Sequence, residues 1–154
     1  TQRPNRAVTT LMNRVAQVRT SYIEYYKLAR AQQAAGLPKT QWEEALVRAG
    51  TLINRQLQAS PNDALALSYL ALVQTRLGQF KEASAASARA VKLASDNAEI
   101  LYNTARMYSL QRNASKAFEH LQSAVRNRYS LPRILDMDFY LLRSNPGFLS
   151  VVSR

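Results

Sequence analysis

The chain has no cysteine among its 154 residues. Disulfide frameworks, thiolate zinc sites and a cysteine nucleophile are therefore excluded, and the redox compartment stays open. No stretch approaches the roughly 18 uninterrupted apolar residues that a membrane-spanning helix needs, and the sequence does not open with the pattern of a signal peptide. We therefore expect a soluble protein of either the cytoplasm or the periplasm.

Glycine and acidic residues are both scarce. The four glycines are scattered, at positions 36, 50, 78 and 147, so there is no phosphate-binding glycine loop. Only 10 aspartates and glutamates stand against 21 lysines and arginines, which gives a net charge of +11. This excess favours acidic partner surfaces. It lies at both ends of the chain instead of in one stripe, and no nucleic-acid-binding motif is visible, so the sequence does not favour a nucleic-acid ligand.

Groups that could carry catalysis are few. His120 is the single histidine and lies within a helical pattern, so we expect it to be solvated or partly packed. Asp136 and Asp138 could hold a metal ion only with further ligands that the sequence does not offer, and we expect them to cap a helix or pair with Arg133 and Arg143. We therefore expect neither an enzyme nor a cofactor or metal site.

A pattern of large and small apolar residues returns after 34 residues, which is typical of stacked helix-turn-helix units. Leu67, Ala71, Ala83 and Ala90 reappear as Leu101, Ala105, Ala117 and Ala124. The spacing predicts helices over about residues 63–77, 80–94, 98–110 and 115–126. Asn62 or Asp63 is suited to cap the first of these, and the cluster of residues 95–97 is suited to cap the third.

A degenerate copy of the same pattern precedes the clear one. Tyr25, Leu28, Ala29, Gln32 and Gly36 reproduce the spacing of Leu67, Leu70, Ala71, Gln74 and Gly78. The offset is 42 instead of 34, and we place the extra residues in the loop at 37–40 and in a helix from about 42 to 59. An addition of about four residues to a helix is close to one turn and leaves the buried face in phase.

The turn of the last copy differs from the others. Gly78 has its counterpart in Arg112, which is followed by Asn113. Because asparagine tolerates a left-handed backbone better than arginine, the sequence predicts a turn shifted by one residue.

These residues resemble the tetratricopeptide repeat, whose pattern has a large residue, then Leu-Gly or Leu-Ala, an aromatic residue and two small residues in the second helix. The resemblance implies an all-α, right-handed α-solenoid of about three helix-turn-helix repeats, with capping helices at both ends. We expect one domain over residues 1–154, with an N-terminal capping helix at 5–21, repeats at 22–63, 64–97 and 98–128, and a C-terminal cap at 129–154. Gln74, Arg112 and Ser95 depart from the pattern, at positions where an aromatic residue, glycine and proline are usual.

The C-terminal stretch 136–148 is similar to the tail that closes many bacterial tetratricopeptide arrays, with an aspartate-hydrophobic segment, a Leu-Arg pair and Pro-x-Phe. We expect it to cover the apolar face of the last repeat, and Asn145-Pro146 to begin a short final helix. The resemblance implies that the protein ends at or near Arg154. The residues expected to cover that face are Leu135, Phe139, Leu142, Phe148 and Val151.

The N-terminal stretch carries a heptad seam with Val8, Leu11, Val15 and Val18. Fewer than three full heptads favour a capping helix packed on the first repeat, and the alternative is a dimerisation helix that makes the chain a self-association module. Ser21 with Glu24 forms a capping-box pattern. The helix therefore either restarts there or runs unbroken from about residue 5 to 35.

The concave surface of such arrays usually holds an extended peptide or a partner helix. On this chain it would be lined by aromatic and basic residues, and arginine grips carboxylates in a bidentate fork. We therefore expect a non-catalytic scaffold that binds an acidic peptide or helix of a partner protein, as a module of a larger bacterial signalling or envelope protein. The alternative is that these faces are solvated or covered by the tail. The expected lining is Tyr26, Lys27, Arg30 and Gln33, then Tyr69, Leu72 and Arg76, then Tyr102, Asn103, Arg106 and Ser109.

Chaperone-binding tetratricopeptide domains hold a C-terminal carboxylate with lysines, asparagines and arginine. Asn103 stands at one position of that clamp, but Ser68 and Leu72 occupy places where it requires lysine and asparagine. The resemblance therefore does not extend to recognition of chaperone tails.

Overall fold

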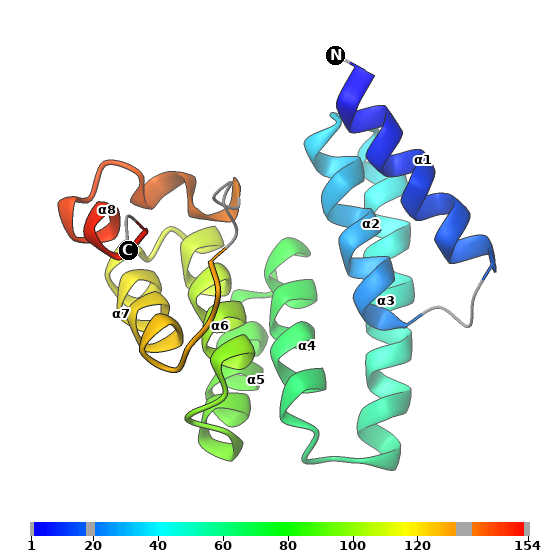
Figure 1. Cartoon of the computed structure of the whole chain (residues 1–154). Coiled ribbons are helices and arrows are strands. Elements are labelled where there is room, and N and C mark those ends of the chain that lie inside the picture. Colours follow the sequence, from blue (N-terminus) through cyan, green and yellow to red (C-terminus); the bar gives the residue numbers. More distant parts are fainter. Residues whose placement is uncertain (1, 18–20, 132–136, 153–154) are drawn as a thin grey trace. The chain divides into compact units, whose positions relative to one another are not determined.

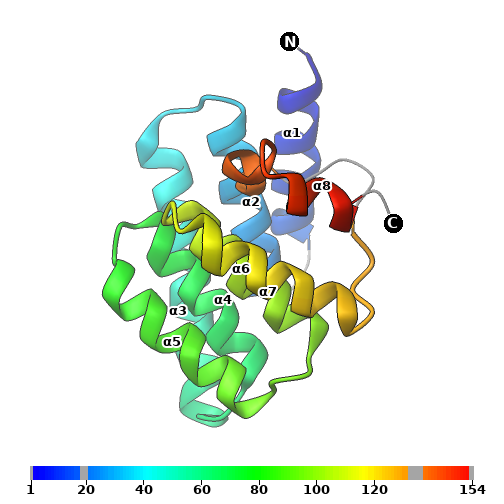
Figure 2. The same ribbon diagram turned by 90° about the vertical axis from the view of Figure 1, so that its left-hand side faces the viewer.

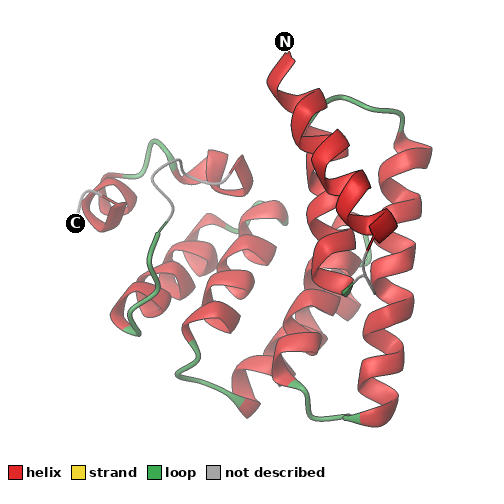
Figure 3. Cartoon of the chain, turned by 45° about the vertical axis from the view of Figure 1, so that its right-hand side comes forward, coloured by secondary structure: helices red, strands yellow, loops and turns green. Residues whose placement is uncertain are grey.

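The computed structural model describes residues 2–17, 21–131 and 137–152, and within these ranges the chain forms helices and loops only (Figure 3). The elements divide between two compact units, Thr1–Pro61 and Asn62–Arg154. Unit 1 holds α1 (Gln2–Gln17), α2 (Tyr22–Ala34) and α3 (Lys39–Ala59). Unit 2 holds α4 (Ala64–Arg76), α5 (Phe80–Leu93), α6 (Ala98–Leu110), α7 (Ala114–Arg126), the 3₁₀-helix η1 (Met137–Leu142) and α8 (Pro146–Val152).

Unit 1 is built on the antiparallel pair α2 and α3, with α1 lying obliquely against α2 (Figure 1). Tyr26 of α2 and Leu46 and Ile53 of α3 are almost completely buried. Gly36 closes the turn between the two helices at φ +71, a backbone conformation that glycine adopts without strain. Val8 of the predicted heptad seam is buried, while the side chains of Val15 and Val18 lie outside the described residues.

Side-chain caps start the helices where the sequence predicts them. Ser21 Oγ accepts a hydrogen bond from the backbone N–H of Glu24 at 3.4 Å, so α2 begins at Tyr22 as a helix separate from α1. Asp63 caps α4 through the N–H three residues on, at 2.9 Å. Asn97 caps α6 by accepting from two N–H groups, each at 3.1 Å. Each cap satisfies backbone donors that the first turn of a helix leaves unpaired.

Unit 2 consists of two further helix pairs, α4 with α5 and α6 with α7, and α6 also packs on α4 (Figure 2). The helices start and end within one residue of the predicted bounds in this unit, whereas α3 in unit 1 starts three residues before the predicted one. The alanines that the repeat predicts at close helix contacts are fully buried, because a small side chain lets two helices approach. These are Ala83, Ala90, Ala117 and Ala124, each with 0% exposure.

The turn between α6 and α7 contradicts the predicted shift by one residue. Arg112 itself has φ 61, the position that Gly78 takes with φ +80 in the preceding copy. Asn113 instead caps α7, where its side chain accepts from the N–H of Lys116 at 3.2 Å. An N-cap residue has a negative φ, and Asn113 has −95, so the left-handed position falls to the residue before it.

The C-terminal segment covers the helix pair α6 and α7. Phe139, Leu142 and Phe148 have 0% exposure, and Val151 is partly buried. Asn145 Oδ1 accepts from the N–H of Gly147 at 2.8 Å, so α8 begins at Pro146 as predicted. Leu135 lies outside the described residues.

Replacing Arg112 by glycine is expected to stabilise unit 2. The left-handed conformation costs a residue with a Cβ atom roughly 1 kcal/mol, part of which glycine gives back through the freedom of its unfolded chain, so we expect a gain of about 0.5 kcal/mol. Urea unfolding followed by circular dichroism measures this difference. The control, Ala85→Gly on the exposed face of α5, should instead lose about 1 kcal/mol. A loss of stability in both variants would contradict the assignment of strain to Arg112.

Candidate functional site

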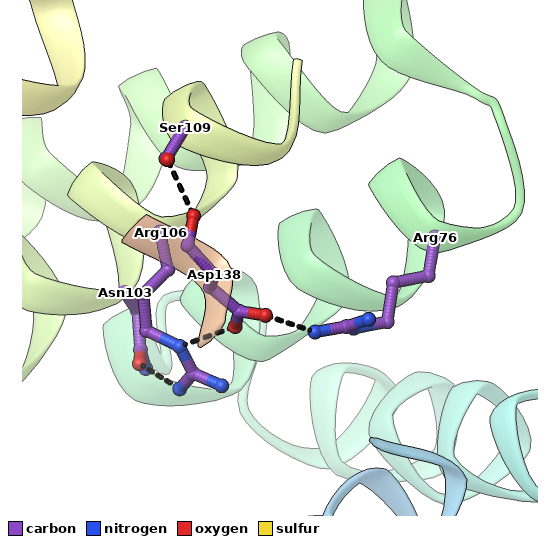
Figure 4. A network of polar contacts seen from close by, with 5 residues as sticks. All are labelled: Arg76, Asn103, Arg106, Ser109 and Asp138. Atoms are coloured by element: carbon purple, nitrogen blue, oxygen red, sulfur yellow. Dashed lines mark hydrogen bonds and ion pairs between the residues drawn. The ribbon is translucent and has the colours of Figure 1, made fainter. Parts of the chain in front are cut away.

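Two arginines from neighbouring repeats converge on one carboxylate of the C-terminal segment (Figure 4). Arg76 Nη2, at the end of α4, lies 2.7 Å from Asp138 Oδ1. Arg106 Nε, on α6, lies 3.0 Å from Asp138 Oδ2. The three side chains are at most 8% exposed, so these charge-assisted contacts are formed away from bulk water.

A series of hydrogen bonds between buried polar side chains orients Arg106. Arg106 Nη1 donates to Asn103 Oδ1 at 3.4 Å, and Asn103 Nδ2 donates to the hydroxyl of Ser68 at 3.1 Å. Ser68 in turn donates to the backbone oxygen of Leu65 at 2.8 Å, so the series of hydrogen bonds ends on the backbone of α4. Asn103 is only 2% exposed, and its amide can satisfy both neighbours at once. Asn103 therefore positions Arg106 and links α4 to α6.

The backbone of η1 is held at the same place. The Ser109 hydroxyl donates to the backbone oxygen of Asp138, next to the carboxylate that the arginines bind (Figure 4). Ser109 is 1% exposed. The segment is thus fixed through its main chain as well as through its charged side chain.

Phe139, the residue that follows Asp138, contacts the aromatic rings of Tyr102 and Phe148. Tyr102 stacks on Tyr129 with ring centroids 4.1 Å apart, and it contacts the ring of Phe139 at 5.4 Å. The guanidinium carbon of Arg106 lies 5.8 Å from the centre of the Tyr102 ring. Tyr102 therefore contacts both the guanidinium of Arg106 and the ring of Phe139. A cation favours the electron-rich face of an aromatic ring, whereas two rings favour offset or edge-to-face arrangements.

Tyr69 is a neutral hydrogen-bond donor at the edge of this cluster. Its hydroxyl donates to Glu99 Oε1 at 3.3 Å. Burial raises the pKa of Tyr69 far above its ordinary value, and the negative charge of Glu99 adds to the shift. The phenol therefore keeps its proton at any physiological pH.

The residues predicted to line the concave surface are largely buried in unit 2. Tyr69, Leu72, Tyr102, Asn103 and Arg106 are each at most 6% exposed. The structure brings Arg76, Tyr102, Asn103, Arg106 and Ser109 together around Asp138. We call the part of α4 and α6 that carries Arg76, Tyr102 and Arg106 the arginine face.

The predicted lining residues of unit 1 have other surroundings. Tyr26 is 1% exposed and belongs to the core. Lys27 is half exposed and pairs with Glu24 at 3.4 Å. Arg30 is partly buried and Gln33 is exposed.

The role of Asp138 differs from the one expected from sequence. Its carboxylate pairs with Arg76 and Arg106, and the guanidinium of Arg143 lies instead 5.6 Å from the ring centre of Tyr140. Pairing of Asp138 with Arg143 is therefore wrong, because the carboxylate is taken by the two arginines of α4 and α6. Asp136 and Arg133 lie outside the described residues. The sequence indicates this contact only through the alternative stated above, in which the tail covers the residues of the concave lining.

Other candidate groups have ordinary surroundings. The ring of His120 contacts the backbone oxygen of Lys116 at 2.9 Å and lies beside Tyr108, with ring centroids 5.4 Å apart. Within the described ranges, no three histidine, cysteine or acidic side chains gather as a metal site would require. Among those same residues, no helix combines the length and apolar character needed to cross a membrane.

The fold places the chain in a structural class. It is all-α, and its helices pack pairwise in the manner of tetratricopeptide helix-turn-helix units. Among solved structures, it is similar to a structure titled "MamA RS-1 ArsTM double mutant", with a TM-score of 0.51 and 18% identity over 97% of this chain and 82% of the other. Another, a crystal structure of MamA, aligns with a TM-score of 0.44 and 20% identity over 80% of this chain and 68% of the other.

Sequence comparisons add no closer relative. No protein-family model matches the chain, and no curated protein is significantly similar to it. The structural likeness at 18% identity therefore shows the fold of the chain alone.

Removing the carboxylate of Asp138 is expected to destabilise unit 2 strongly. Asp138→Ala leaves Arg76 and Arg106 buried without their shared counter-charge, which costs about 3–5 kcal/mol in comparable sites. Urea unfolding of the whole chain measures the loss. Asp96→Ala, at an exposed position in the loop before α6, is the matched control and should stay within about 0.5 kcal/mol of the wild type. A loss below about 1 kcal/mol for Asp138→Ala would show that the ion pairs contribute little net stability.

The raised pKa of Tyr69 gives stability a pH dependence of known sign. A group whose pKa is higher in the folded state stabilises fully below its unfolded pKa, near pH 10, and loses that contribution as the pH rises toward the folded value. The free energy of unfolding should therefore fall more steeply above about pH 10 in the wild type than in Tyr69→Phe. Urea midpoints between about pH 8 and 11 test this. Parallel pH profiles would mean that the phenol ionises equally well in both states.

Proposed function

We propose that the chain is a non-catalytic protein-binding scaffold whose arginine face recognises an acidic segment with an aromatic or aliphatic anchor. The observation that carries the proposal is the pair of ion pairs that Arg76 and Arg106 form with the two carboxylate oxygens of Asp138. The chain's own segment has the chemistry expected of a ligand, since an aspartate is followed directly by a buried phenylalanine. The tetratricopeptide-like fold supports a protein as the partner.

The charge of the chain agrees with an acidic partner. A net charge of +11 raises the local concentration of acidic segments and speeds their encounter with the surface. Arginine is well suited to the final contact because its planar group matches the geometry of a carboxylate. We further propose that the scaffold acts as a module of a larger bacterial signalling or envelope protein, with the partner supplying the acidic segment.

A partner must compete with η1 for the arginine face. The competing segment is covalently attached, so its effective concentration is in the millimolar range for a short linker. The segment to be displaced is η1, six residues long, and its Phe139 ring also contacts the ring of Phe148 in α8, with centroids 6.4 Å apart. A partner succeeds when it buries more apolar surface than Phe139 and Leu142 do.

The proposal is tested with a synthetic peptide of residues 136–144, labelled with fluorescein and followed by fluorescence anisotropy. In the wild type the tail should exclude the peptide, whereas Asp138→Ala with Phe139→Ala vacates the face. We expect the double variant to bind the peptide at least about tenfold more tightly than the wild type does. Circular dichroism checks that the double variant keeps its helix content. If helix content is lost, the variant Asp138→Asn is used in place of the double variant.

Two matched changes identify the contact. Arg106→Gln in the double variant should abolish binding, while Lys81→Gln, an exposed charge on α5, should leave it unchanged. A peptide with asparagine in place of its second aspartate should also fail to bind. Equal binding of both peptides, or no binding by any variant, would reject the arginine face as a ligand site.

A further inference from the structure

Three adjoining cavities follow one side of the α2 and α3 pair in unit 1. The first, of about 310 Å³, lies between Gln32 and Gln41, near the turn that joins the two helices. The second, of about 200 Å³, shares Tyr25 and Arg48 with the first. The third, of about 390 Å³, shares Leu52 with the second and continues toward the far end of α3. We call the face that these three neighbouring cavities follow the α2–α3 groove.

The side chains of the groove lie on one stripe of each helix. Along α3 they recur at spacings of three and four, which places them on one face. The stripe runs through Gln41, Glu44, Arg48, Leu52 and Arg55. From residue 41 to residue 56 a helix rises by about 22 Å. The groove is therefore long enough for a helix of about 15 residues.

The same face is covered in unit 2, where one repeat stacks on the next. Leu28 lines the groove, and its counterpart two copies on is Thr104. The hydroxyl of Thr104 lies 3.0 Å from that of Ser87 on α5, which belongs to the preceding helix pair. Gln111 likewise donates to Thr75 on α4 at 3.2 Å. The groove is thus the stacking face of a repeat, the surface on which such an array receives another helix.

In unit 1 the described side chains of α1 cover this face only in part. α1 packs against α2 and contributes Met12 to the first cavity, yet Met12 remains 53% exposed. The side chain of Gln32 also lines this cavity, is 6% exposed and has no hydrogen-bond partner at its Oε1 atom. A buried amide oxygen without a donor is costly, so the packing of α1 leaves this end of the face incompletely satisfied.

The charges of the groove select an acidic occupant. Arg48 is held in place, because its guanidinium contacts Glu44 at 2.8 Å and lies 6.0 Å from the ring centre of Tyr25. Arg55 is exposed, and no ion pair holds it among the described residues. Residues 1–61 carry nine basic and three acidic side chains in all. A second copy of this basic chain would be repelled, whereas an acidic segment would be attracted.

We propose that the α2–α3 groove is a docking site for an acidic amphipathic helix of a partner protein, which extends the helical stack beyond α1. The apolar side of that helix packs on Tyr25, Leu28 and Leu52, as in other helix-in-groove complexes. Its acidic side faces Arg55. This site is separate from the arginine face and does not depend on the function proposed for it.

The test uses the full chain with one cysteine introduced, Thr51→Cys, labelled with an environment-sensitive bimane dye. Because the chain has no other cysteine, the dye reports on the groove alone. The probe is a 15-residue helical peptide with leucine on one stripe and glutamate on its flanks. We expect a saturable fluorescence change, and we expect Arg55→Glu to weaken binding at least about fivefold. The matched charge reversal, Lys81→Glu on α5, should have no effect.

Other outcomes overturn the proposal. The same peptide with lysine in place of glutamate should bind at least about fivefold more weakly, and equal binding would remove the argument from charge. Absence of saturation up to about 1 mM peptide would reject the groove as a docking site. Sedimentation velocity of the unlabelled chain measures whether it forms a dimer, which is the remaining alternative. A dimer that Arg55→Glu disrupts would assign the groove to a second copy of the chain instead.

Discussion

The sharing of one carboxylate by two arginines is the constraint on which unit 2 depends. Arg76 and Arg106 stand on different helix pairs, and Asp138 comes from a third element, so one side chain ties α4, α6 and η1 together. Buried charges are tolerated only when they are paired and hydrogen-bonded, and Asn103, Ser68 and Ser109 supply the additional bonds. Phe139 then closes the apolar part of the same contact. A polar network with this many fixed partners specifies one position of the C-terminal segment, whereas apolar packing alone would accept several.

Local signals made most of the fold predictable. Helix ends are set by nearby side chains, and Ser21, Asp63 and Asn97 cap the helices they were expected to begin. The alanines at helix crossings could be named because the repeat places them at equivalent positions in two copies. The prediction of the turn at Arg112 was wrong for a local reason too. Asparagine suits both the left-handed turn position and the N-cap of a helix, and in the structure Asn113 is the N-cap of α7. The early start of α3 at Lys39 was missed because Pro38 takes the cap position without a side-chain hydrogen bond.

The candidate site was predictable only in its parts. The repeat register placed Arg76, Tyr102, Asn103 and Arg106 on one face, and the structure does bring them together. It could not show that Asp138 binds there, because 62 residues separate Asp138 from Arg76 and no local pattern encodes such a pairing. The groove of unit 1 was missed for a similar reason. Which side of a helix pair stays open depends on how far α1 covers it, and the heptad seam of α1 does not specify that extent.

The position of Asp138 in the chain has a consequence for synthesis on the ribosome. The arginine face is complete once α6 has emerged, but its counter-charge lies 32 residues after Arg106 and arrives only later. During that interval the face lacks the carboxylate of Asp138 and the ring of Phe139, which contact it in the finished fold. Unit 2 thus passes through a stage in which α4, α5, α6 and α7 have been synthesised while its core still lacks Phe139 and Phe148. Contacts of long sequence separation close last. The nascent chain therefore presents a surface that the finished fold conceals.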